Sequence, residues 1–356
     1  MWRVLELQPI ACGCPNTCRH CSEEGRPPFG ALMSVDDVRW LVEELVGAWE
    51  RTLGTVPEVR GVEEGLEPTA HPDFLRLIEY AWSFYPDSCD TLGTNGYGLA
   101  RLGNWQSTFD RLRELGIACL GMAIHGLPQE HDWFVGRPGA FRDLAVTTER
   151  ALESGLDVAF EIHLNRRNVR TFGAVVEVLT ELGGGRARLT SGVDAYYMND
   201  RLRALEALRP TQAEMAAIVH VWPLAPDRGS DTEANLTRQL ASRERGADLC
   251  TYEPAGTGPE GRRRGCFRVT PAFDVIERFL SRPHLHHGNL RRDGADRVWQ
   301  SVLDATLPPM PEPDELAATY GDFHSDLLYP GAESIHMKLC DRYWSAEARG
   351  DPPGRL

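Results

Sequence analysis

The chain has 356 residues, 42% hydrophobic and 25% charged, a composition typical of one large or two smaller globular domains. Its formal net charge of -14 and isoelectric point near 5.3 argue against a nucleic-acid-binding protein, because such a surface repels phosphate backbones. We find no apolar run of the ~20 residues that a membrane span requires and no signal-peptide pattern, so we expect a cytoplasmic protein whose nine cysteines are thiols or metal ligands.

Strands and helices are predicted to alternate from the start of the chain to about residue 200. The helix at 35–53 shows apolar residues at helical spacing and has Ser34 in position to cap it. Strands are expected at 4–7, 59–63, 90–94, 117–124, 158–164 and 187–193, and further helices at 72–84, 105–115, 141–154 and 172–182. Six such β/α units with short connections predict an α/β fold with a parallel sheet, arranged as a partial (β/α)6 TIM-like barrel. Reactive groups are then expected at the C-terminal ends of the strands.

The pattern changes after residue 200, which sets the expected domain organisation. We predict the partial barrel at 1–200, a helical linker at 201–240 that includes a helix near 211–221, a smaller α+β extension at 241–348 and a disordered tail at 349–356.

Four of the nine cysteines fall within ten residues, in a loop that follows the first predicted strand. Cys14, Cys18 and Cys21 are separated by three and then two residues, so one loop brings three thiolates to a single metal centre. Three ligands leave one iron of a four-iron cluster open. A zinc site that uses these cysteines with Cys12 or His20 is the alternative, although no second ligand pair is found nearby.

Three further segments of the sequence help to interpret the cysteine motif. They are Gly65-Leu66-Glu67-Pro68, Thr94-Asn95-Gly96, and a stretch that begins at Arg137-Pro138-Gly139 and continues to Asn165-Arg166-Arg167-Asn168. With the cysteine motif and in this order, they resemble the radical S-adenosylmethionine (SAM) superfamily over residues 1–200. Leu66 departs from the second glycine that is usual in the family's turn.

The resemblance implies a [4Fe–4S] cluster held by Cys14, Cys18 and Cys21, with SAM chelated to the open iron. It further implies that Glu67 accepts a hydrogen bond from the SAM ammonium group and that Gly65 lets the backbone approach closely. Asn95 and Arg137 are expected at the SAM site, Arg137 either against the SAM carboxylate or as a surface arginine. The family also implies a small ferredoxin or flavodoxin as electron donor.

Candidate catalytic residues come from two neighbouring strands. Along 157–164 one face is apolar and the other carries Glu161 and His163, which predicts a polar barrel interior. His125 ends the preceding strand. Each of these three side chains either contacts SAM or substrate, or is a hydrogen-bonded core or rim residue.

The segment from 265 to 303 resembles a SPASM or shortened "twitch" extension, which in many relatives holds auxiliary iron–sulfur clusters. A cysteine expected just after Val275 is absent. Cys250, Cys266 and Cys340 remain as ligands for a second cluster, but a degenerate extension that only caps the barrel is favoured.

We expect a tailoring enzyme of natural-product biosynthesis that acts on a small polar metabolite, such as a sugar, aminocyclitol or nucleoside. Dehydration, deoxygenation, epimerisation, dehydrogenation and decarboxylation are the candidate reactions, and the oxidoreductase and lyase classes both stay open. The barrel begins almost at Met1, without a separate peptide-recognition domain, and cysteines for auxiliary clusters are few. A maturase of a ribosomally made peptide is the first alternative, and a non-enzymatic zinc-binding scaffold protein is the second.

Overall fold

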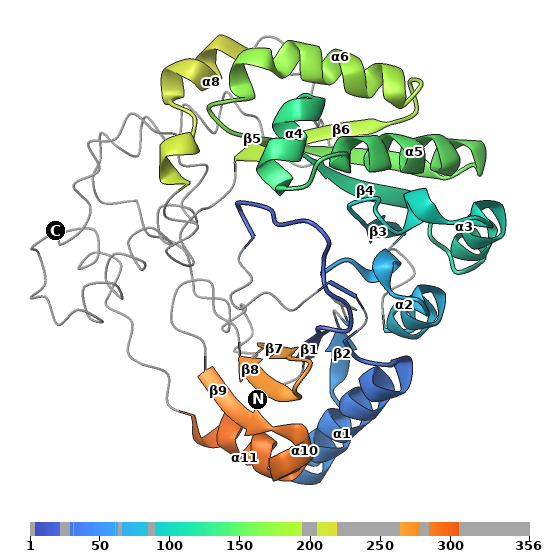
Figure 1. Cartoon of the computed structure of the whole chain (residues 1–356). Coiled ribbons are helices and arrows are strands. Elements are labelled where there is room, and N and C mark those ends of the chain that lie inside the picture. The colour runs from blue at the N-terminus through green and yellow to red at the C-terminus, as the bar shows by residue number, and fades with distance from the viewer. Residues whose placement is uncertain are drawn as a thin grey trace, which may run out of the picture.

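The computed structural model describes residues 4–21, 29–30, 32–60, 62, 66–84, 90–193, 205–218, 264–277 and 285–305. Strands and helices alternate as far as β6 (Figure 1). The strands are β1 (Val4–Pro9), β2 (Glu58–Arg60), β3 (Thr91–Gly93), β4 (Cys119–Ile124), β5 (Asp157–Leu164), β6 (Arg188–Val193), β7 (Arg264–Val269), β8 (Asp274–Glu277) and β9 (Leu285–Asn289). The α-helices are α1 (Val35–Leu53), α2 (Phe74–Trp82), α3 (Trp105–Glu114), α4 (Pro128–Val135), α5 (Ala140–Glu153), α6 (Phe172–Leu182), α8 (Gln212–Ile218), α10 (Leu290–Asp293) and α11 (Ala295–Asp304). Short 3-10 helices lie at Pro68–Ala70, Leu99–Arg101, Val169–Thr171 and Glu206–Leu208.

The strands form two sheets, with orders β2-β1-β7-β8-β9 and β3-β4-β5-β6. All pairs among β1 to β6 are parallel, and β7 also pairs in parallel with β1, whereas β8 and β9 are antiparallel. Helices α1, α2, α3, α5 and α6 follow one another around the outside of these strands (Figure 1). The fold is therefore α/β, a partial TIM-like barrel, as the sequence predicts.

In the described residues β2 and β3 are not paired by hydrogen bonds and belong to different sheets. The sequence does not predict this break. Both strands are only three residues long, so each offers few backbone groups for pairing. The other edge of β1 pairs with β7, which comes from the C-terminal third of the chain. Strand β1 therefore pairs with β2 on one side and, on the other, with β7, which is more than 250 residues away in the sequence.

Local sequence signals explain where α1 begins and ends. Ser34 accepts a hydrogen bond from the Asp37 amide while the Asp37 carboxylate accepts from the Ser34 amide, a complete capping box. Gly54 ends the helix in the left-handed conformation, with φ of 66°. The buried side chains recur every three to four residues and face β1; they include Val38, Leu41, Val42 and Leu45.

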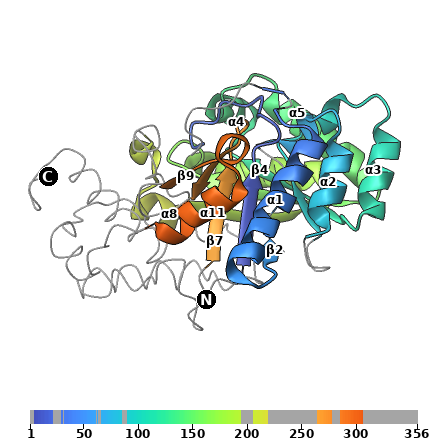
Figure 2. The same ribbon diagram turned by 90° about the horizontal axis from the view of Figure 1, so that it is seen from below.

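Two hydrophobic clusters make up most of the described core. One lies between β4, β5 and their helices, and the other joins β1 and α1 to β7, β8 and α11. In the second, Trp49 and Trp299 are fully buried with ring centroids 4.9 Å apart, and Phe267 lies 5.7 Å from Trp299. Helix α11 lies beside α1 in the view from below (Figure 2). Strands β7 and β8 and helix α11 therefore share a core with the first β/α unit.

The predicted elements up to residue 193 match the structure to within a few residues, but helix α4 was not expected. The helix predicted near 211–221 corresponds to α8. Most of the predicted linker, much of the extension and the whole tail at 349–356 lie outside the described residues, so the domain boundaries stay predictions. Within the described part, none of the helices is long and apolar enough to cross a membrane.

Replacing Trp299 with alanine should lower the free energy of unfolding by about 3–5 kcal/mol, the usual cost of truncating a buried tryptophan. Urea denaturation followed by circular dichroism measures this. The control is Val56→Ala, because Val56 is 76% exposed and its loss should change stability by less than about 0.5 kcal/mol. Equal midpoints for the two variants would contradict a core shared by α1 and α11.

Candidate functional site

The loop of residues 10–21, here called the cysteine loop, leaves the C-terminal end of β1 and runs toward α4 (Figure 1). Its backbone is fixed at several points: Thr17 N donates to Val135 O at 2.8 Å, Arg19 N to Phe134 O at 2.9 Å and Gly13 N to Gly30 O at 2.9 Å. The loop is therefore anchored on the last turn of α4. Its position follows from the barrel rule that loops after the strands carry the reactive groups.

The three cysteines at the predicted spacing form no disulfide and are partly exposed; they are Cys14, Cys18 and Cys21. Cys12 differs from them, because it is fully buried. Burial raises the pKa of the Cys12 thiol to about 12, and the nearby charge of Glu67 adds to the rise. Since a metal ligand must be a thiolate, Cys12 is the least suitable sulfur of the four.

Gly136 brings α4 into direct contact with the cysteine loop. It ends the helix with φ of 67°, and Thr17 Oγ1 donates a hydrogen bond to its carbonyl at 3.1 Å. A Cβ atom at Gly136 would lie 2.1 Å from Thr17 Oγ1 and 3.0 Å from the Thr17 carbonyl oxygen. Only glycine permits both the left-handed backbone and this close approach.

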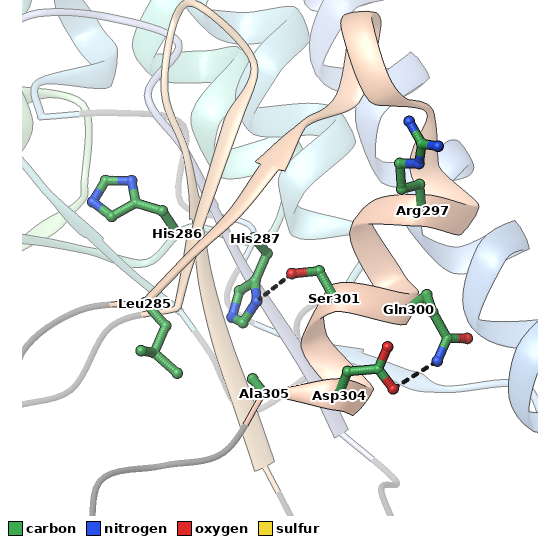
Figure 3. A pocket seen from close by; sticks show the side chains of 8 residues that line it. All are labelled: Leu285, His286, His287, Arg297, Gln300, Ser301, Asp304 and Ala305. Atoms are coloured by element: carbon green, nitrogen blue, oxygen red, sulfur yellow. Dashed lines mark hydrogen bonds between the residues drawn. The ribbon is translucent and has the colours of Figure 1, made fainter.

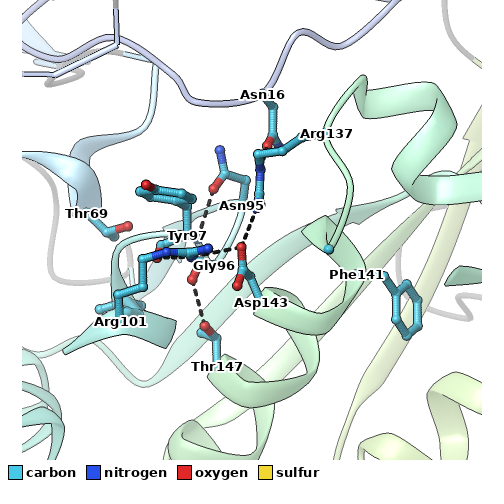
Figure 4. A network of polar contacts seen from close by, with 12 residues as sticks. Asn16, Thr69, Asn95, Gly96, Tyr97, Arg101, Arg137, Phe141, Asp143 and Thr147 are labelled. Carbon is cyan, nitrogen blue, oxygen red and sulfur yellow. Dashed lines mark hydrogen bonds and ion pairs between the residues drawn. The ribbon is translucent and has the colours of Figure 1, made fainter. Parts of the chain in front are cut away.

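Arg137 ties the same loop to α5 (Figure 4). Its Nε donates to Asn16 Oδ1 at 2.6 Å, and its Nη1 forms an ion pair with Asp143, which also pairs with Arg101 at 2.8 Å. The Arg137 and Asp143 side chains are only 14% and 11% exposed, so this pair is desolvated. Nη2 of Arg137 is buried and has no hydrogen-bond partner among the described residues.

Glu67 is a buried carboxylate, 1% exposed, beside the C-terminal end of β3. Its Oε1 accepts hydrogen bonds from Thr69 and from Thr94 (2.7 Å), and its Oε2 accepts from the Asn95 amide at 2.6 Å. Burial raises the pKa of Glu67, although these hydrogen bonds favour the charged form. Among the described residues no cationic side chain pairs with it.

Asn95 links Glu67 to the cysteine loop. Its backbone amide donates to Glu67, and its side-chain Nδ2 donates to Cys14 Sγ at 3.2 Å. The adjoining Leu66 amide donates to the carbonyl of Cys12 at 3.0 Å, so leucine at the position where the family usually has glycine still ties this turn to the loop. Three segments that are distant in sequence therefore meet around Cys14.

Three imidazoles gather on the other side of the loop and are called the imidazole cluster: His20, His125 and His163. The ring centroid of His125 lies 4.5 Å from that of His20 and 4.9 Å from that of His163. Burial, helped by the neighbouring imidazoles, holds the pKa of His125 well below its ordinary value, so its ring is neutral near pH 7. Phe134 stacks on the His125 ring with centroids 4.3 Å apart.

The structure brings most of the predicted site residues together. Glu67 and Asn95 meet at Cys14, and Arg137 reaches the loop through Asn16. His125 and His163 join His20, whereas the Glu161 side chain is 62% exposed and lies 3.9 Å from His163. Gly65, Cys250 and Cys340 lie outside the described residues, and Cys266 is a free, partly exposed cysteine in β7. The second cluster therefore stays a prediction.

The sequence interpretation missed the residues that hold these groups in place: Asn16, Thr69, Thr94 and Asp143. Asn16 lies inside the cysteine motif, and Asp143 follows Arg137 by six residues in the first turn of α5, so local spacing offered some signal for both. Thr94 lies in the Thr94-Asn95-Gly96 segment, which marked its position but not its role, whereas Thr69 gave no signal because threonine is common in buried turns. The structure shows that both hydroxyl groups donate hydrogen bonds to the Glu67 carboxylate.

A separate cavity of about 510 Å³ lies between β9 and α11 (Figure 3). His287 at its wall is buried and contacts Glu277 at 3.1 Å and Ser301 at 3.5 Å. Glu277 lies just after Val275, where the SPASM or twitch pattern has a cysteine. In this structure its carboxylate contacts His287 instead. The cavity contains none of the site residues described above.

Comparison with known proteins shows which families and structures this chain is similar to. Residues 9–179 match the family model of the radical SAM superfamily. A curated relative, Fe-coproporphyrin III synthase of Methanosarcina barkeri (strain Fusaro / DSM 804), is 24% identical over 169 residues. That match covers 47% of this chain and 39% of the relative, so less than two thirds of the relative's length is spanned.

Solved structures of similar arrangement include native anSMEcpe with bound AdoMet and Cp18Cys peptide, with a TM-score of 0.49 and 13% identity over 97% of both chains. Another is coproporphyrinogen III oxidase (HemN) from Escherichia coli, with a TM-score of 0.42 and 11% identity over 98% of this chain and 79% of that one.

Over residues 9–179 the chain resembles the enzymes of the radical SAM superfamily. Enzymes of this class use a [4Fe–4S] cluster and SAM.

Gly136→Ala should destabilise the protein by about 1–3 kcal/mol more than Gly139→Ala, because overpacking against Thr17 is added to the backbone strain. Gly139 is the matched control: it has φ of 80°, but a Cβ there meets nothing within 4 Å. Urea denaturation of the two variants gives the difference. Equal destabilisation would show that α4 does not press against the cysteine loop.

Proposed function

We propose that this enzyme cleaves SAM reductively and abstracts a hydrogen atom from a small polar metabolite, with Cys14, Cys18 and Cys21 as cluster ligands. When bound, the cluster and SAM together supply a 5′-deoxyadenosyl radical. The donor set fits the cluster, because three cysteines that form no disulfide lie on one loop that α4 and Asn95 hold in place. Hydrogen bonds to cluster sulfur, such as the one Asn95 offers to Cys14, tune the reduction potential.

The single observation that carries the proposal is the buried carboxylate of Glu67 beside the cysteine loop. Removing a carboxylate from water is costly unless a cation joins it. Its oxygens already accept from Thr69, Thr94 and the Asn95 amide, which orients them and holds the charge. An ammonium group, such as that of SAM, supplies the missing positive charge with a charge-assisted hydrogen bond.

Arg137 offers a site for the carboxylate of the same ligand. Two of its nitrogens are committed to Asn16 and Asp143, which fixes the guanidinium plane. The buried Nη2 has no partner among the described residues and is therefore suited to receive a carboxylate, such as that of SAM. A guanidinium that is fixed by two partners loses little freedom when it binds a third.

The substrate is placed against the C-terminal ends of β4 and β5, where His125 and His163 face the cysteine loop. Polar groups there suit a hydroxylated or amino-bearing metabolite, for example a sugar, an aminocyclitol or a nucleoside. We further propose a ferredoxin or flavodoxin as reductant and a twitch-like extension over the barrel mouth. A coproporphyrin-type tetrapyrrole belongs in any substrate panel, because the curated relative is Fe-coproporphyrin III synthase.

Cys18→Ala should abolish SAM cleavage, because it removes one thiolate of the cluster. Anaerobically reconstituted protein is incubated with SAM and dithionite, and 5′-deoxyadenosine is measured by chromatography. Cys119→Ala serves as the control: Cys119 is a buried cysteine in β4, outside the cysteine loop, and its variant should keep its iron. Normal cleavage by the Cys18 variant would overturn the ligand assignment.

Glu67→Gln should weaken SAM binding by about 10- to 150-fold, the loss expected for one hydrogen bond to a charged group of about 1.5–3 kcal/mol. Equilibrium dialysis of cluster-loaded protein measures the binding. Glu153→Gln, at an exposed position on α5, is the control, and equal affinities for the two variants would contradict the role of Glu67.

A further inference from the structure

The imidazole cluster has the geometry of a metal site that is distinct from the cluster cysteines. His20 comes from the cysteine loop, His125 from the residue after β4 and His163 from β5. One ring nitrogen of each lies within 4.8 Å of one ring nitrogen of each of the other two. Three separate elements therefore converge their side chains on a single point.

His125 provides a second, independent sign of a ligand. Its side chain is 2% exposed, and its Nδ1 has no hydrogen-bond partner among the described residues. Buried imidazole nitrogens are normally satisfied, because an unsatisfied one costs about 1–3 kcal/mol. The ring is also fixed in place: Phe134 stacks on it with 11° between the planes, and the backbone amide of His125 donates to His131 Nδ1 at 3.3 Å.

We propose that His20, His125 and His163 bind a divalent first-row transition metal ion, such as Zn²⁺ or Co²⁺, next to the iron–sulfur cluster. Three imidazoles suit these ions and leave a fourth position for an oxygen or nitrogen donor. A tetrahedral zinc bound at about 2.0–2.1 Å to each nitrogen needs nitrogen atoms about 3.3 Å apart. The present nitrogens lie within 4.8 Å of one another, so metal binding requires them to move closer together.

The surroundings favour a cation at this point. Glu161 Oε2 lies 3.9 Å from His163 Nε2, beyond hydrogen-bonding distance, so this carboxylate contributes negative charge near the three rings but does not orient them. The three rings belong to the β4–β5 end of the barrel, where we place the substrate. The metal site goes beyond the proposed radical chemistry and does not rest on it, since metal binding requires only the imidazoles.

The first measurement counts metal in the cluster-loaded wild-type enzyme. The protein is incubated anaerobically with excess Zn²⁺, desalted, and analysed for zinc and iron. We expect one additional zinc per chain compared with His163→Gln, together with unchanged iron. His286→Gln is the matched control, because His286 is an exposed histidine on β9, and this variant should retain zinc as the wild type does.

A second measurement excludes zinc binding by the cluster thiols. In the full chain with Cys14, Cys18 and Cys21 all changed to serine, Co²⁺ is titrated and its visible ligand-field bands are recorded. The bands should appear at one equivalent, and adding His163→Gln should weaken Co²⁺ binding more than about 100-fold, since losing only a second-sphere partner costs about 10–100-fold. The His163 side chain is 18% exposed, so this variant should fold, which melting by circular dichroism verifies.

Equal zinc content and equal Co²⁺ affinity with and without His163 would overturn the proposal and leave the three rings as a packed group of imidazoles. The formation of 5′-deoxyadenosine is measured in parallel on the same wild-type sample. A zinc-free enzyme that cleaves SAM rejects the metal site alone. A zinc-binding protein that does not cleave SAM rejects the proposed function alone.

Discussion

The rest of the site depends on one constraint: α4 and the turn that follows it hold the cysteine loop in place. A loop with three cysteines has no regular structure of its own, so its shape must come from outside. Backbone hydrogen bonds from Thr17 and Arg19 to the end of α4, and the Arg137 bridge from Asn16 to Asp143, supply that shape. A metal cluster needs its ligands positioned in advance, and here one short helix and one arginine position them.

Glu67 depends on this arrangement as well. Its carboxylate is oriented by donors from two segments, the 3-10 turn with Thr69 and the end of β3 with Thr94 and Asn95. Asn95 then donates to Cys14, so a shift of the cysteine loop disturbs the carboxylate through a single side chain. The proposed ligands of the cluster and of SAM are therefore one connected network, and truncating one member should affect both cofactors.

Most of the helices and strands could be predicted from the sequence, because short local patterns determine where they begin, where they end and which face is buried. Ser34 and Gly54 mark the ends of α1, and alternation along β5 separates its apolar face from the face with Glu161 and His163. Helix α4 escaped prediction because its eight residues mix charged and aromatic side chains without a clear apolar stripe. The β1–β7 pairing escaped because no local pattern specifies which strand occupies the free edge of another strand.

In the candidate site, motif spacing predicted the cluster ligands and Glu67, but not the side chains that contact one another around them. Cys14, Cys18, Cys21 and Glu67 could be named from the order of the motifs, whereas the Arg137–Asp143 pair and the meeting of three histidines are tertiary facts. The sequence also left open whether His125 and His163 are rim residues. The structure places both against His20, in the loop of the cysteines.

Three buried groups around the cysteine loop share one energetic property. The Glu67 carboxylate has no ion-pair partner among the described residues, and neither Arg137 Nη2 nor His125 Nδ1 has a hydrogen-bond partner there. A buried polar atom without a hydrogen-bond partner costs about 1–3 kcal/mol of stability, and a ligand that satisfies Arg137 Nη2 or His125 Nδ1 offsets that cost. Because ligands that bind only the folded state stabilise it by mass action, cofactor loading and folding stability should be strongly coupled in this protein. The charges differ in sign and position, so one ligand cannot relieve all three: an ammonium suits Glu67, a carboxylate suits Arg137, and a metal ion suits the imidazoles.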